Sequence, residues 1–191
     1  MQSQRKPDSR ICRTRTAIHG AFLELLGQKD VDAITVTDVA QRASVDRKTI
    51  YNYYAGTAAI LDDLENELVH AVSGVIRDDE IGAFLHDPLG FLQAVTKAFD
   101  RNDPQALLVK NKRSRVLDKL GASLKTRVSL FLAEYIEPSR RQFSALYAEF
   151  ITSGVVSVYR DWLRGGRVQP LEEIARQVRQ LSEGSMASFL L

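Results

Sequence analysis

The sequence predicts an all-α protein of about nine helices, in which a three-helix helix-turn-helix domain precedes a larger helical domain. Apolar residues recur at intervals of three and four along most of the 191 residues, which is the period of an amphipathic helix. Only five prolines occur in the chain, so few positions force such a helix to end. The two shortest helical patterns lie on either side of a tight turn at residues 44–46.

The segment from Thr35 to Leu61 contains that turn. Its first half has an apolar stripe at helical spacing, and we expect Thr37 to cap this helix through its hydroxyl. We expect Asp46 to cap a second helix over residues 47–54. In the second helix Ile50 and Tyr54 are four residues apart, so they share a face that can pack on the first helix.

The opposite face of the second helix carries a cation, a hydroxyl and an amide, namely Lys48, Thr49 and Asn52. Lysine and asparagine side chains can bond base edges, whereas hydroxyl groups can donate to phosphate oxygens. The pattern therefore predicts base or near-base contacts for this face, with Arg47 beside it. The residues expected to contact phosphates are Thr37, Tyr51 and Tyr53.

Residues 35–45 read Thr-Val-Thr-Asp-Val-Ala-Gln-Arg-Ala-Ser-Val, and Thr-Ile-Tyr-Asn-Tyr-Tyr follows at 49–54. Together they resemble the helix-turn-helix of TetR-type transcriptional regulators. The segment 147–181 is similar, more weakly, to the C-terminal domain of the TetR subgroup that includes the activator of dihydroxyacetone kinase. The resemblance implies a dimer that binds double-stranded operator DNA, and a repressor that a small-molecule effector releases. The alternative is a transcriptional activator that acts without a ligand or with a protein partner.

Three positions depart from the family's usual pattern. Ser44 stands where a turn glycine is common, and serine fits there only if the turn needs no positive φ. Asp46 stands where serine is frequent, and its carboxylate would be repelled by a nearby phosphate. Thr57 replaces a lysine that usually faces a phosphate, so we expect weaker binding that depends less on salt.

The positive charge of the chain is concentrated around the helix-turn-helix. Residues 1–60 hold nine Lys or Arg against six Asp or Glu, whereas the remainder holds 17 against 18. We expect residues 1–8 to form a flexible basic tail and a first helix to start near Ser9, with an apolar stripe from Ile11 to Leu25. The DNA-binding domain is then expected at residues 9–56.

Residues 57–191 are expected to form a helical domain for ligand binding and dimerisation. Its first helix, from Thr57 to about Ile76, carries four carboxylates that could hold a metal, but they fit a solvated face better. The polar stretch 77–82 is expected to be a break before a helix that starts at Pro88. Asp103 and Pro104 are expected to open a short helix.

The basic cluster that follows, Lys110 to Lys119, could attract an anion or lie in solvent. Further helices are expected over residues 116–135, from Ser139 to Trp162, and from Pro170 to Leu181. The last two are the eighth and ninth helices. The eighth is apolar on more than one side, so we expect it to contact the core and a second copy. The predicted homodimer forms through helices 8 and 9.

Aromatic and leucine side chains on these helices could line an apolar effector pocket or simply fill the core. The residues assigned to this pocket are Phe91, Phe99, Leu107, Phe131, Tyr147, Phe150 and Trp162. The three histidines lie on separate segments without metal-ligand spacing, and no glycine-rich phosphate loop or nucleophile motif occurs. We therefore predict no enzyme activity, no catalytic residue, no metal and no cofactor.

One cysteine, no signal peptide and no apolar run of the ~20 residues that span a membrane favour a cytoplasmic protein.

Overall fold

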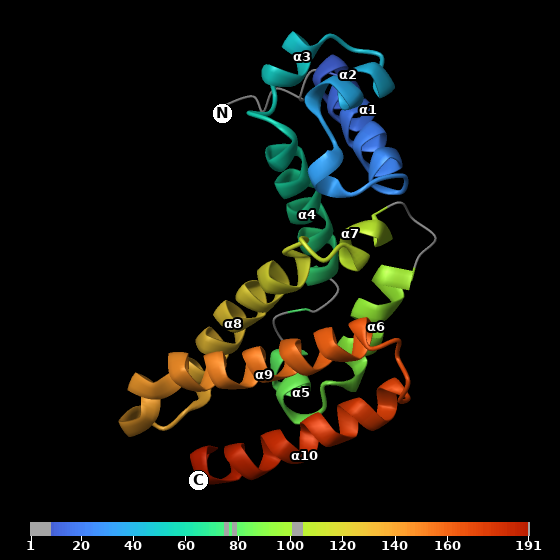
Figure 1. The fold of residues 1–191 in the computed structure, drawn as a ribbon. Coiled ribbons are helices and arrows are strands. Elements are labelled where there is room, and N and C mark those ends of the chain that lie inside the picture. The colour runs from blue at the N-terminus through green and yellow to red at the C-terminus, as the bar shows by residue number, and fades with distance from the viewer. Residues whose placement is uncertain (1–8, 75–76, 78–79, 101–104, 191) are drawn as a thin grey trace, which may run out of the picture. The chain divides into compact units, whose positions relative to one another are not determined.

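The computed structural model describes residues 9–74, 77, 80–100 and 105–190. These residues form ten α-helices and two 3₁₀ helices and contain no strand, which confirms the all-α prediction (Figure 1). None of the helices in these ranges is long and apolar enough to cross a membrane. The basic tail 1–8 and the helix start expected at Asp103 lie outside the described residues.

The chain divides into two compact units, each of which is described by itself. The first comprises Met1–Glu67 with Asn102–Ser114, and the second comprises Leu68–Arg101 with Arg115–Leu191. The helices of the first unit are α1 (Ser9–Leu26), η1 (Val31–Ala33), α2 (Val36–Arg42), α3 (Arg47–Tyr51), the first part of α4 (Thr57–Ser73) and α7 (Ala106–Lys110). The helices of the second unit are α5 (Ile81–His86), α6 (Leu89–Asp100), α8 (Val116–Tyr135), η3 (Pro138–Phe143), α9 (Ser144–Arg164) and α10 (Leu171–Leu190).

The core of the first unit joins α1, α2, α3 and α4. Ile18 and Phe22 of α1, Val39 of α2, Ile50 of α3 and Ile60 of α4 are completely buried. All of them except Ile60 lie on the apolar faces that the helical period predicted. The predicted stripe of α1 is wrong at its start, because Ile11 is 43% exposed.

The core of the second unit is built mainly from α8 and α9, which pack along each other (Figure 1). Leu124, Val128 and Leu132 of α8 are buried, as are Ala148 and Val155 of α9. Helix α6 packs on α10 and α5.

Two expectations about the second unit need correction. The stretch 77–82 is not simply a polar break, because helix α5 starts at Ile81 and buries Ile81, Phe84 and Leu85. Residues 138–143 form a 3₁₀ helix, so α9 starts only at Ser144. The short α5 was missed because six residues hold too few periods to stand out from a loop.

Candidate nucleic-acid interface

Helix α2 begins with a capping box at Thr35. The backbone N–H of Asp38 donates to the Thr35 hydroxyl oxygen at 3.2 Å, and the Thr35 N–H donates to the Asp38 carboxylate at 2.8 Å. The prediction that Thr37 caps this helix is therefore wrong by two residues. Thr37 is the second residue of the helix and is exposed, so its hydroxyl is accessible to solvent.

The Asp38 carboxylate also accepts a hydrogen bond from the Lys29 ammonium at 2.7 Å. This bond, followed by those from Thr35, lowers the pKa of Asp38 to about 2. The cap is thus ionised at every pH near neutrality, and it ties the start of α2 to the loop after α1.

The turn between α2 and α3 places Ser44 at a φ of 55°. The N–H of Val45 donates to the Ala40 carbonyl at 3.0 Å, and the N–H of Ser44 donates to the Gln41 carbonyl at 3.3 Å. These two bonds make a Schellman motif, in which the position of Ser44 is normally glycine. Serine was expected to fit this position only if the turn needs no positive φ. The turn does need one, so Ser44 is strained.

Helix α3 is held by Ile50 on its inner face and by Tyr54, which follows the helix. Ile50 is completely buried and Tyr54 is 7% exposed, as the spacing predicted. The helix is shorter than expected, since it ends at Tyr51 and residues 52–53 form a turn. Asp46 occupies the N-cap position, but its side chain makes no capping hydrogen bond.

The outer face of α3 is open to solvent. Arg47, Lys48, Tyr51 and Asn52 are exposed, and Tyr51 keeps 59% of its surface. Thr49 and Tyr53 are half-buried beside them. Within the described part of the chain, the side chains of Arg47, Lys48 and Asn52 have no hydrogen bond or ion pair that would have to break before they contact a ligand.

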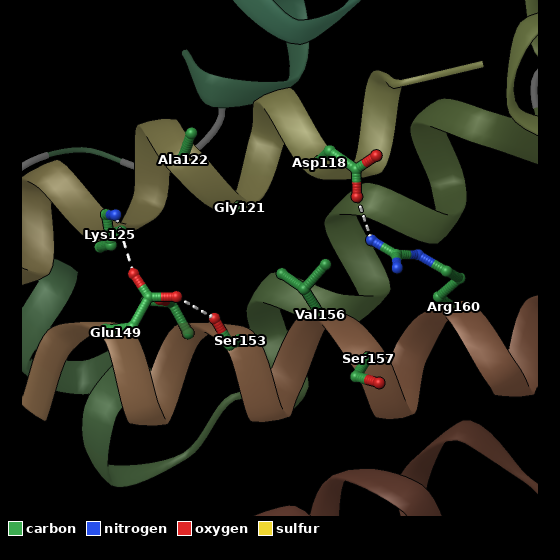
Figure 2. Close-up of a pocket in the computed structure, with 10 residues that line it drawn as sticks. Asp118, Gly121, Ala122, Lys125, Glu149, Ser153, Val156, Ser157 and Arg160 are labelled. Carbon is green, nitrogen blue, oxygen red and sulfur yellow. Dashed lines mark hydrogen bonds and ion pairs between the residues drawn. The ribbon is translucent and has the colours of Figure 1, made fainter. Parts of the chain in front are cut away.

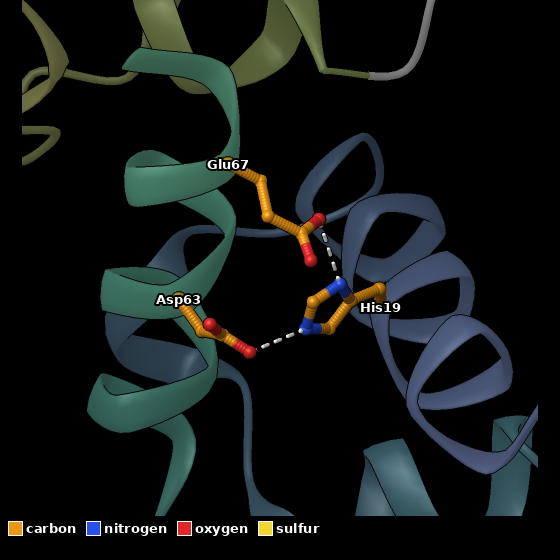
Figure 3. Close-up of side chains that lie close together, drawn as sticks. All are labelled: His19, Asp63 and Glu67. Atoms are coloured by element: carbon orange, nitrogen blue, oxygen red, sulfur yellow. Dashed lines mark hydrogen bonds and ion pairs between the residues drawn. The ribbon is translucent and has the colours of Figure 1, made fainter. Parts of the chain in front are cut away.

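A polar network lies behind α3 and was missed in the sequence. The Tyr54 hydroxyl donates to the Asp63 carboxylate at 2.7 Å, and the Arg15 guanidinium donates to the same oxygen at 2.6 Å. Nε2 of His19 lies 2.8 Å from the Tyr54 oxygen. The same nitrogen lies 3.1 Å from the Asp63 carboxylate (Figure 3). The network joins α1, α4 and the chain just after α3.

The ionisation of these groups follows from their contacts. Burial opposes the charge on Asp63, but hydrogen bonds from Tyr54 and Arg15 outweigh it and lower the pKa of that carboxyl. Burial, aided by the Asp63 carboxylate, raises the pKa of Tyr54 to about 12. Hydrogen bonds with Tyr54 and Asp63 raise the pKa of Arg15. The network is therefore held as a neutral phenol between a carboxylate and a guanidinium.

The carboxylates of α4 do not all lie on a solvated face. Glu65 is only 2% exposed, so its expected outward position is wrong. Asp63 is partly buried in the network, whereas Asp62 is exposed. His19, for which the sequence offered no partner, contacts two of these acids, Asp63 and Glu67.

The residues assigned to an effector pocket fall in different surroundings. Phe91, Phe99 and Trp162 are buried, whereas Phe131 and Tyr147 are half-buried. Phe150 is 65% exposed, and Leu107 belongs to the first unit. Phe91 also lines a hollow of about 330 Å³ beside α5. The seven positions stay a prediction, with Phe150 and Leu107 the two that lie apart from the core of the second unit.

A polar hollow of about 410 Å³ lies between α8 and α9 (Figure 2). Lys125 and Glu149 form an ion pair of 2.8 Å across one end, and Asp118 pairs with Arg160 across the other. Its floor includes Gly121, where an added Cβ would lie 3.2 Å from Val156. Because its charges already pair with each other, this hollow differs from the apolar pocket predicted from the sequence.

The first unit is thus a helix-turn-helix with an exposed, cationic second helix, which defines a DNA-binding regulator. Residues 19–64 match the family model described as bacterial regulatory proteins of the tetR family, and residues 89–184 match the one described as a transcriptional regulator C-terminal region. The chain belongs to the TetR family of transcriptional regulators. This family consists of DNA-binding regulators and not of enzymes.

Two relatives from Bacillus subtilis (strain 168) match shorter segments. The uncharacterized HTH-type transcriptional regulator YxbF is 33% identical over 64 residues, which are 33% of this chain and 17% of that protein. The uncharacterized HTH-type transcriptional regulator YdeS is 42% identical over 50 residues, which are 26% of this chain and 25% of that protein. The chain thus matches a quarter or less of the length of these relatives.

Two solved structures share the fold over almost the whole chain. A TetR transcriptional regulator from Streptococcus agalactiae 2603V aligns with a TM-score of 0.66 at 24% identity, covering 92% of this chain and 96% of that one. The dihydroxyacetone kinase operon activator DhaS aligns with a TM-score of 0.61 at 16% identity, covering 93% and 98%. At these identities the likeness concerns the fold alone.

Proposed function

We propose that this regulator binds operator DNA as a homodimer, acts as a repressor, and leaves the DNA when a small-molecule effector binds its C-terminal domain. The observation that carries DNA recognition is the outer face of α3, where cationic and amide side chains are exposed and unengaged within the described residues. In this proposal residues 9–56 form the DNA-binding domain, residues 57–191 form the regulatory domain, and the protein works in the cytoplasm.

The contacts divide into two groups. Lys48, Thr49 and Asn52, joined by Arg47, read base edges from the major groove. Thr37, Tyr51 and Tyr53 contact phosphates and fix the register. The exposed position of Thr37 on α2 supports its role, because its hydroxyl is not used as a cap.

Asn52→Ala tests the base contacts. It should relax the sequence preference at one or two base pairs and weaken specific binding by about 1–3 kcal/mol. Binding-site selection with both proteins measures this directly. An unchanged preference in the variant would remove Asn52 from the reading face.

Dimer formation is assigned to α9 and α10, the eighth and ninth helices of the sequence prediction. Leu146 and Phe150 of α9 are each 65% exposed, and Leu181 of α10 is 72% exposed. Gly154 lies exposed on the same side of α9, and an added Cβ would meet nothing within 4 Å. Large apolar side chains on an open face indicate an interface, and a bare glycine among them permits a close helix crossing.

Phe150→Asp should convert the dimer to a monomer, because it places a charge within that face. Val168→Asp is the matched control, since Val168 is 81% exposed in the loop after α9. Sedimentation of both variants at micromolar concentration separates the two outcomes. A dimer that survives Phe150→Asp would place the interface elsewhere.

The alternative is an activator that acts without a ligand or with a protein partner. One protein of similar fold, DhaS, is named as an operon activator, and this is the reason to keep activation as the alternative. A reporter placed behind the bound site distinguishes the two, because loss of the regulator raises expression under repression and lowers it under activation.

Selection of bound fragments from the source genome, repeated at two salt concentrations, tests the proposal as a whole. Enrichment of a short inverted repeat is the expected result, because two recognition helices of a dimer meet successive major grooves. Salt-sensitive retention without a shared sequence would leave only general DNA affinity. Retention of no DNA would contradict the proposal.

A further inference from the structure

Behind the recognition helix, four side chains from three segments meet around His19. Arg15 and His19 come from α1, and Tyr54 follows α3. Asp63 and Glu67 come from α4, and Figure 3 shows both beside His19. His19 is 7% exposed, so its ring is enclosed by these groups. Nε2 faces Tyr54 and Asp63, and Nδ1 lies 3.3 Å from the Glu67 carboxylate.

The number of protons in this cluster decides which of its contacts are favourable. The hydroxyl of Tyr54 has one proton, and Asp63 accepts it at 2.7 Å. A carboxylate can only accept, so each ring nitrogen that faces one needs its own proton. All the observed contacts are therefore satisfied together only when both nitrogens of His19 are protonated.

Neutral imidazole has a single N–H and must lose one of these contacts. If the proton is on Nε2, the lone pair of Nδ1 faces the Glu67 carboxylate. If it is on Nδ1, Nε2 must accept the Tyr54 proton, and Asp63 then loses its hydrogen bond from the phenol. Either arrangement weakens one of the links between α1, α4 and Tyr54.

We infer that His19 is a proton-dependent positioning residue for the recognition helix, which rests on the proposed DNA-binding function. The link to α3 is direct, because the N–H of Tyr54 donates to the Ile50 carbonyl at 2.9 Å. With His19 protonated, Tyr54 is fixed from both α1 and α4, and the end of α3 is fixed with it. Loss of the proton removes one contact, either that of His19 with Glu67 of α4 or that of Tyr54 with Asp63, and so weakens the support on which the helix that meets DNA rests.

A proton fits this cluster better than a metal ion does. One nitrogen of His19 and the carboxylates of Asp63 and Glu67 could reach a common ion, since their ligating atoms lie within 4.8 Å of one another. The Arg15 guanidinium already lies 2.6 Å from Asp63 and 3.4 Å from Glu67. When His19 is protonated, its imidazolium and the Arg15 guanidinium balance the carboxylates of Asp63 and Glu67. A divalent ion would add positive charge that nothing in the cluster compensates.

The test measures the affinity of the full-length protein for a fragment enriched from the genome, between about pH 6 and about pH 8, the range in which histidine changes charge. The wild type should bind about tenfold more tightly at the lower pH, the lower end of the effect of one charge-assisted hydrogen bond. His19→Gln should show no such change. His70→Gln changes an exposed histidine on α4, the helix that carries Asp63 and Glu67, and should keep the pH dependence of the wild type.

Two measurements keep this test independent of folding and of the proposed function. Glu67→Gln changes an exposed partner of Nδ1, so it should fold normally and reduce the pH effect. The imidazole nitrogen NMR shifts of the free protein at the lower pH of the binding test should show His19 with both nitrogens protonated. A neutral His19 in these spectra, or an unchanged pH profile in His19→Gln, would overturn the inference. Failure to bind DNA with a protonated His19 would contradict only the proposed function.

Discussion

Replacing Ser44 with glycine should stabilise the helix-turn-helix unit. Ser44 has a φ of 55°, where an L-residue is strained by roughly 1–2 kcal/mol. Glycine removes this strain but adds about 0.5–1 kcal/mol of backbone entropy to the unfolded chain. Ser44 is exposed, and its hydroxyl makes no hydrogen bond within the described residues, so no other interaction is lost. The net gain in the free energy of unfolding should be about 0.5–1 kcal/mol.

Urea unfolding followed by circular dichroism measures this gain, and a melting temperature higher by about 2 °C should accompany it. Ala43→Gly is the matched control, because Ala43 has a φ of −77° and gains no relief from glycine. The control should lose about 0.5–1 kcal/mol. If Ser44→Gly is no more stable than the wild type, or if both variants shift alike, the strain assigned to the turn is refuted.

Three further predictions concern the same unit. Thr35→Ala should lower the free energy of unfolding by about 1 kcal/mol, because it removes the cap of α2. Thr37→Ala should leave stability unchanged and weaken DNA binding. Urea titrations and DNA-binding assays on both variants measure these effects. Thr57→Lys adds a cation at the first residue of α4, so it should tighten DNA binding and steepen the slope of log affinity against log salt by about 0.9; an unchanged slope would show that this position faces no phosphate. The Asp38 cap stabilises the fold fully above the ordinary pKa of 3.8 and is lost as the pH falls through about 2, so acid titration should show a loss in this window that is absent in Asp38→Asn.

The sequence predicted best what depends on local periodicity. Ile50 and Tyr54 were expected on the inner face of the recognition helix from their spacing alone, and both are buried there. The exposed positions of Lys48 and Asn52 follow from the same rotation of about 100° per residue. An α-helix fixes which residues share a face, so this part of the candidate interface needed no knowledge of the tertiary structure.

The prediction failed where the answer depends on one dihedral angle or on a distant residue. Thr35 and Thr37 both suit an N-cap, and only the reciprocal bond with Asp38 selects Thr35. The φ of Ser44 is set by the angle at which α3 leaves α2, which periodicity does not report. His19 and Asp63 are 44 residues apart in the chain, so no local pattern could join them or reveal that Tyr54 lies between them.

We expect the three departures from the usual family pattern to act on two properties, stability and DNA affinity, which can be measured separately. Ser44 affects the free energy of unfolding through a strained turn and offers no charge to DNA. Asp46 makes no capping bond, so we expect its carboxylate to repel a phosphate near the start of α3 and to lower affinity. We expect Thr57 to lower affinity as well, because it leaves α4 without a cation at its first residue. Changing Ser44 should therefore raise stability without altering the salt dependence of binding, whereas changing Asp46 or Thr57 should alter the salt dependence with little effect on stability. If Asp46 and Thr57 act in this way, the regulator binds DNA through fewer phosphate contacts, and we expect more of its affinity to come from the proposed base-reading face of α3.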